Sequence, residues 1–109
     1  MDNNKDDKYF EKKIIESIDI INKYMKEKTK DDLENDILLN NTVMFQLICI
    51  SENINKLSDR YKQKKSGIAW NQIKGIRNII VHNYDGVNYK TIFDTVIDDL
   101  PVLKKELCE

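Results

Sequence analysis

Apolar residues recur along most of the chain at steps of three and four, which is the period of an amphipathic helix. Residues 1–6 do not share this pattern; they are polar and are expected to be disordered. A first helix is predicted over residues 7–28, where the repeating apolar positions include Phe10, Ile14, Ile18, Ile21 and Met25.

The same period continues from Leu33 to Tyr61 without any Gly or Pro, so one long second helix is predicted there. Residues 40–42, Asn-Asn-Thr, are the place where this helix could kink. A third helix is predicted over residues 68–81, and Gly86 provides a residue that tolerates the positive φ of a turn. The third helix contains Gly75, which costs helix stability and is expected to permit the close approach of a neighbouring helix.

A fourth helix is predicted from Tyr89 to Leu107, with a bend near Pro101 because proline has no backbone N–H to donate. Four helices joined by short loops favour an all-α fold, an antiparallel four-helix up-down bundle. The 109 residues fit a single domain over 1–109. No apolar run approaches the roughly 20 residues that span a bilayer, so no membrane contact and a cytosolic location are expected. The two cysteines lack metal-ligand spacing, so no metal site is expected.

The charge of the chain is nearly balanced overall but uneven along its length. The formal net charge is −1, yet the segment 56–77 holds seven basic residues and one acidic residue. Any attraction to nucleic acid must therefore come from a local patch. The candidate RNA-binding patch consists of Lys62, Lys64, Lys65 and Lys74, and the alternative is an ordinary solvated surface.

The stretch RNIIVHNY, residues 77–84, contains the only histidine of the chain and one of its two arginines. Apart from the two arginines, the sixteen basic residues of the chain are lysines, so an arginine at position 77 suggests a need for the geometry of a guanidinium. A guanidinium presents a planar fork of donors that matches a phosphate or a carboxylate. His82 can exchange protons near neutral pH. The plain alternative is that Arg77 pairs with an acid of another helix while His82 ends its own helix favourably.

Spacing limits how these two residues can act together. Five residues rotate an ideal helix by a net of about 140°, so Arg77 and His82 share a face only if the helix loosens near its end. Cutting RNA without a metal also needs both a base and an acid, and the chain has one histidine. A catalytic function therefore predicts a homodimer whose two-fold axis brings two copies of each residue together. Glu52 could orient the pair, or could belong to a solvated helix face.

The stretch AWNQIKGIRNIIVHNY, residues 69–84, resembles the signature of the HepT-like toxins, a branch of the HEPN superfamily. The shared features are an Arg, a His five positions later and a Tyr two positions after that. ICISENINKLSDRY resembles the second helix of the same family, so the similarity covers nearly the whole chain.

The resemblance implies a metal-independent endoribonuclease, without cofactor, whose active site forms at a homodimer interface. His82 would transfer protons, Arg77 would hold the scissile phosphate, and Asn78 would help to position them. Tyr84 matches the tyrosine that a partner enzyme, a minimal nucleotidyltransferase antitoxin, modifies with AMP. The alternative is a non-catalytic HEPN module that binds a nucleotidyltransferase as an adaptor subunit, because a fold alone does not specify an activity.

Overall fold

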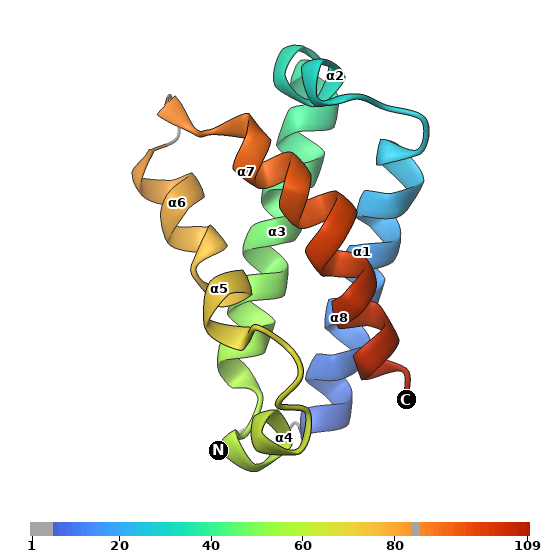
Figure 1. The fold of residues 1–109 in the computed structure, drawn as a ribbon, viewed down its shortest axis with the longest axis vertical. Coiled ribbons are helices and arrows are strands. Elements are labelled where there is room, and N and C mark those ends of the chain that lie inside the picture. The colour runs from blue at the N-terminus through green and yellow to red at the C-terminus, as the bar shows by residue number, and fades with distance from the viewer. Residues whose placement is uncertain (1–5, 84–85) are drawn as a thin grey trace.

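The computed structural model describes residues 6–83 and 86–109, and within these ranges all regular structure is helical (Figure 1). The predicted all-α fold is confirmed. Disorder was expected for residues 1–6; residues 1–5 lie outside the described part, while Asp6 accepts a hydrogen bond from the Tyr9 N–H and caps the first helix. The elements are α1 (Asp7–Met25), α2 (Lys30–Asn35), α3 (Ile37–Lys56), α4 (Asp59–Lys64), α5 (Trp70–Lys74), α6 (Ile76–His82), α7 (Tyr89–Asp94), the π-helical segment η2 (Thr95–Asp99) and α8 (Leu100–Leu107).

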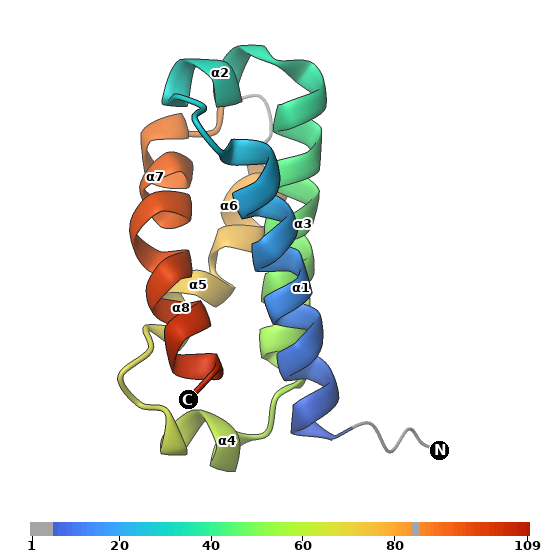
Figure 2. The ribbon, with the colours of Figure 1, turned by 90° about the vertical axis from the view of Figure 1, so that its right-hand side faces the viewer.

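The long elements lie side by side and alternate in direction (Figures 1 and 2). Helix α3 runs antiparallel to α1, α5 and α6 run back along α3, and α7 to α8 return beside α1. Helices α2 and α4 lie at opposite ends, where the chain turns. Aliphatic side chains fill the interior, and Ile18, Ile50 and Leu103 are fully buried. The alternating directions agree with the expected up-down arrangement.

The predicted second helix is divided into three shorter helices. The first break, between α2 and α3, lies at Asp36, whose side chain accepts hydrogen bonds from two backbone N–H groups in the first turn of α3. Residues 40–42, where a kink or an interruption was considered, do not interrupt the helix, because α3 runs through them from Ile37 to Lys56. Asn40 is buried there and donates to the Leu33 carbonyl (3.1 Å) and the Tyr89 hydroxyl (2.8 Å). Ser58 caps α4 in the same way that Asp36 caps α3.

The third predicted helix is broken at Gly75, which separates α5 from α6. A Cβ atom placed on Gly75 would lie 3.3 Å from the carbonyl oxygen of Asn71 and 3.5 Å from that of Gln72. Within residues 6–83 and 86–109, no atom of a neighbouring helix lies within 4 Å of this position, so the expected role of Gly75 in helix–helix approach is wrong. The glycine instead relieves crowding within the break itself.

The bend expected near Pro101 stays a prediction, but the helix is irregular just before that residue, in the π-helical segment η2 (Thr95–Asp99). Proline at 101 cannot donate to the carbonyl of Ile97, so the regular pattern of backbone hydrogen bonds cannot continue there. The Leu100 N–H bonds to the Thr95 carbonyl, five residues earlier, and widens the helix before α8 begins. The first helix is likewise shorter than expected, since Glu27 adopts a positive φ of 63° after α1 ends at Met25.

Although no apolar run long enough to span a bilayer was expected, helix α3 has the length and the apolar composition of a membrane-crossing helix. The central helix of a helical bundle has the same properties, because it is covered on several sides. Helix α3 contacts α1, α2, α5 and α6, and eight of its residues are buried. Its place in the core explains the buried part of this apolar composition, whereas Ile37, Leu38 and Phe45 are exposed.

Candidate active site

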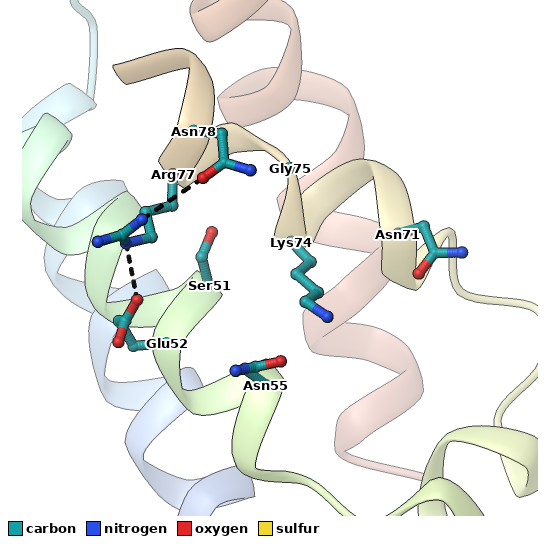
Figure 3. Close-up of a pocket in the computed structure, with 8 residues that line it drawn as sticks. All are labelled: Ser51, Glu52, Asn55, Asn71, Lys74, Gly75, Arg77 and Asn78. Atoms are coloured by element: carbon teal, nitrogen blue, oxygen red, sulfur yellow. Dashed lines mark hydrogen bonds and ion pairs between the residues drawn. The ribbon is translucent and has the colours of Figure 1, made fainter. Parts of the chain in front are cut away.

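A pocket of about 370 Å³ lies between α3 and the α5–α6 pair (Figure 3). Helix α3 forms one wall, and the chain around the Gly75 break forms the other. The lining residues are polar or glycine: Ser51, Glu52, Asn55, Asn71, Lys74, Gly75, Arg77 and Asn78. The pocket therefore brings together four of the residues selected from the sequence, namely Glu52, Lys74, Arg77 and Asn78.

Arg77 and Glu52 form an ion pair across this pocket, with Nε and Oε1 2.8 Å apart. Arg77 also donates from Nη1 to the Asn78 side-chain oxygen, at 3.4 Å. A guanidinium has five N–H donors, so these two contacts leave three without a partner among the described residues. Both members of the pair are about half exposed, at 43% and 53%. Glu52 thus holds the guanidinium in place while most of its donors remain available to a ligand.

Ser51 determines how the two walls of the pocket meet. Its side chain is buried, and its hydroxyl donates to the Ile73 carbonyl at 3.1 Å, which joins α3 to α5. Ile76 and Ile80 bury the opposite face of α6 in the core and so turn Arg77 toward α3. Ser51 was not predicted as a site residue from the sequence, although a hydroxyl on the apolar stripe of a helix is a signal of a buried hydrogen bond.

His82 lies at the end of α6, is exposed, and does not line the pocket. The helix remains α-helical through His82, so the loosening that a shared face would require is not observed. Ideal geometry then puts the Cα atoms of Arg77 and His82 about 9 Å apart, on faces rotated by about 140°. One copy of the chain therefore does not bring Arg77 and His82 into one pocket. Tyr84, the predicted modification site, lies outside the described residues.

Comparison with known protein families shows which family the chain belongs to. Residues 14–109 match the family described as "Ribonuclease HepT-like". The chain belongs to the HepT-like ribonuclease family. Membership confirms the resemblance carried by the motif at residues 77–84, and it makes this chain a member of an endoribonuclease family.

The relatives of this HepT-like chain include proteins from bacteria and archaea. It is 28% identical over 96 residues to a "Putative RNase" of Caldanaerobacter subterraneus, covering 88% of this chain and 86% of that protein. A "Probable ribonuclease HepT" of Thermococcus cleftensis is 28% identical over 91 residues, covering 84% of this chain and 83% of the relative. A "Gamma-glutamylcyclotransferase and putative RNase" of Methanocaldococcus jannaschii is 33% identical over 94% of this chain, which spans only 46% of that protein's length. No solved structure matches the chain.

The lysines of the predicted RNA-binding patch are dispersed in this HepT-like fold. Lys74 lines the pocket, whereas Lys62 and Lys64 lie on α4 at one end of the bundle. The Lys65 ammonium donates to the Glu106 carbonyl at 2.6 Å and so is bound near the C-terminus. Of the four, only Lys74 shares a pocket with Arg77, and RNA binding by this group stays a prediction.

Exposed apolar side chains continue from the pocket along α3 and α6. Leu38 and Phe45 precede Glu52 at intervals of seven residues, so all three lie along one stripe of α3. Val81 lies one turn after Arg77 on α6. These apolar residues are 79% (Leu38), 61% (Phe45) and 46% (Val81) exposed. The face of the HepT-like chain that carries the Arg77–Glu52 pair is thus partly apolar.

No group of three or more His, Cys, Asp or Glu side chains within residues 6–83 and 86–109 is arranged to hold a metal ion.

Proposed function

We propose that this HepT-like chain is a metal-independent endoribonuclease toxin that acts as a homodimer, with Arg77 and His82 of both copies around one cleft. The observation that carries the proposal is the Arg77–Glu52 pair in its pocket, where three guanidinium donors have no partner within the described residues. A planar fork of donors suits a phosphodiester better than the lysines that dominate this surface.

A second copy supplies what one chain lacks. His82 points from a different face of α6 than Arg77, so a cleft containing both requires another α6 nearby. The exposed stripe of Leu38 and Phe45 and the neighbouring Val81 is the kind of apolar surface that a partner covers. Packing this face against itself about a two-fold axis would bring two Arg77 and two His82 side chains to the same seam.

The proposed reaction needs no group beyond these side chains and the RNA. His82 of one copy removes the proton of the ribose 2′-hydroxyl, and the resulting oxygen attacks the adjacent phosphorus. His82 of the other copy gives a proton to the departing 5′-oxygen, so the products are a 2′,3′-cyclic phosphate and a 5′-hydroxyl. Arg77 binds the phosphate oxygens and stabilises the charge that accumulates on them. Glu52 and Asn78 hold the guanidinium in position.

Regulation is proposed to act through Tyr84, and the support for it is sequence position. Tyr84 follows His82 by two residues, as does the tyrosine of the family motif, and one relative is named as a ribonuclease HepT. A minimal nucleotidyltransferase antitoxin would transfer AMP to the phenol, and the added negative charge would repel RNA from the cleft. Coexpression with the neighbouring gene, followed by peptide mass measurement, tests this step. A Tyr84 hydroxyl that always stays unmodified removes the switch but leaves the nuclease.

The activity is tested on purified protein with RNA in EDTA. Wild type is expected to cut and to leave cyclic phosphate ends, whereas His82→Ala is expected to be inactive and Arg77→Ala to cut about 10²–10³ times more slowly. Arg60→Ala is the matched control, since Arg60 is the other arginine and is exposed on α4, away from the pocket. Equal cutting by all four proteins would end the proposal. RNA binding without turnover by unmodified wild type would favour the adaptor function instead.

A further inference from the structure

The pocket extends beyond the groups that the proposed reaction uses. Figure 3 shows Arg77 and Glu52 on one side of Ser51, with Lys74, Asn55 and Asn71 on the other. Lys74 comes from α5 and points into the pocket, whereas Arg77 comes from α6 beyond the Gly75 break. At about 370 Å³, the space falls within the roughly 300–1,000 Å³ range of small-molecule sites. The second half of the pocket therefore has room for a ligand group of its own.

The charge in this half of the pocket suits a single phosphate. Among the described residues that line the pocket, Glu52 is the only carboxylate, and it is already paired with Arg77. Lys74 makes no ion pair within the described part of the chain, so no described carboxylate compensates its ammonium charge. One uncompensated positive charge beside Arg77 matches the next phosphodiester of a strand whose scissile phosphate lies at Arg77.

The amides in the same half suit the edge of a base. The side chains of Asn55 and Asn71 are exposed and form no hydrogen bonds with the described residues. Each amide offers an acceptor oxygen and a donor nitrogen, the combination that pairs with the adjacent donor and acceptor of a nucleobase edge. The described residues that line the pocket include no aromatic or large aliphatic side chain, so these residues would recognise a base by hydrogen bonds rather than by stacking.

We infer that Asn55, Asn71 and Lys74 form a subsite for the nucleotide next to the scissile phosphate, in which the two amides recognise the base and Lys74 binds its phosphate. The inference rests on the proposed ribonuclease function and adds to it the source of base preference. It assigns a role to Asn55 and Asn71 in α3 and α5, two positions outside the motif at residues 77–84.

The test uses short oligonucleotides with one cleavable ribonucleotide in an otherwise 2′-deoxy strand and each of the four bases at the flanking positions. Wild type is expected to show about a tenfold spread in kcat/KM among the bases at one flanking position. Asn55→Ala and Asn71→Ala are expected to reduce that spread to about twofold. Asn22→Ala, an exposed asparagine of α1 outside this pocket, is the control and should keep the wild-type spread.

Lys74 is tested through salt dependence. Lys74→Gln is expected to raise KM for every base alike and to lower the slope of log KM against log salt by about one. Lys105→Gln, at an exposed position of α8, should leave both unchanged. A KM effect confined to one base, or an unchanged slope, would assign Lys74 a different role and overturn this part of the subsite.

The outcomes separate this inference from the proposed function. If wild type cuts RNA but both asparagine variants keep its base preference, the subsite is wrong and the nuclease stands. If wild type cuts no RNA, the proposed function fails, and fluorescence anisotropy with the same oligonucleotides decides the subsite. A binding preference that disappears in Asn55→Ala supports base recognition by the two amides, although no scissile phosphate then lies next to it. Equal binding by wild type and variant, or no binding at all, overturns it. Thermal melts should match wild type, because neither amide makes a hydrogen bond within the described chain.

Discussion

Replacing Arg77 separates a catalytic role from a structural one. The plain alternative, in which Arg77 merely pairs with an acid of another helix, predicts the same Arg77–Glu52 contact that the structure contains. The two hypotheses differ in how much the replacement of Arg77 should change the free energy of unfolding and the rate of RNA cleavage. A structural pair should affect the free energy of unfolding and little else, whereas a phosphate-binding guanidinium should affect catalysis much more than stability.

The stability term follows from the geometry of the pair. Two unit charges about 4 Å apart attract by about 1 kcal/mol in water and by about 4 kcal/mol at an effective dielectric constant of 20. Both side chains are about half exposed, which places the pair near the aqueous limit, and fixing two long side chains costs entropy. Exposed pairs of this kind contribute about 0.2–1 kcal/mol. A double-mutant cycle with Arg77→Ala and Glu52→Gln should therefore give a coupling energy below about 1 kcal/mol.

The expected effect of removing Arg77 on catalysis is larger than its effect on stability. Removing a positioned donor that stabilises transition-state charge lowers kcat by about 10²–10³, equivalent to about 2.7–4 kcal/mol. Arg77→Lys keeps the positive charge but lacks the planar set of N–H donors, so its cleavage rate should lie between those of Arg77→Ala and wild type.

Urea unfolding at pH 7, at one fixed protein concentration because a dimer is proposed, measures the coupling energy. RNA cleavage by the same preparations measures kcat/KM. A coupling energy above about 2 kcal/mol, or a fall in kcat/KM of less than tenfold, would refute the reasoning.

Three further predictions concern stability. Trp70→Phe removes the indole N–H that donates to two carbonyl oxygens around the end of α4 at 3.1 Å, and should lower the free energy of unfolding by about 1–2 kcal/mol in urea titrations. Thr29→Ala breaks the capping box with Asp32 and should speed hydrogen exchange in α2, at a cost of about 1 kcal/mol. Burial raises the pKa of the Asp99 carboxyl, and the nearby Asp98 raises it further. The folded protein therefore loses stability as the pH rises through that raised pKa. Asp99→Asn should have a higher melting temperature than wild type at pH 7 and the same melting temperature below pH 3.8. An Asp99→Asn advantage that persists at low pH would contradict this cause.

The helices themselves could be predicted because their cause is local. An apolar stripe with a period near 3.6 residues has to be buried, and few arrangements other than a helical bundle bury several such stripes at once. The breaks were harder to predict, because similar polar residues have opposite effects in different surroundings. Asp36 ends one helix and caps the next, whereas Asn40 continues α3 because two tertiary partners satisfy its amide. No local pattern distinguishes these two cases.

The residues of the site divide in the same way. The scarcity of arginine and histidine and the motif at residues 77–84 selected Arg77, Asn78 and His82 without any coordinates. Glu52 could be named from the sequence as a possible support, but its partner could not, because α3 and α6 come together only through packing.

The sequence alone determined the helical class, the family and the chemical groups available, since these depend on residue type and spacing. Only the tertiary structure decided that Arg77 meets Glu52 in a polar pocket beside Lys74, while His82 stays outside it. The physical reason is that a helix rotates each side chain by about 100° per residue, so contacts between helices depend on how each one is turned and where it breaks.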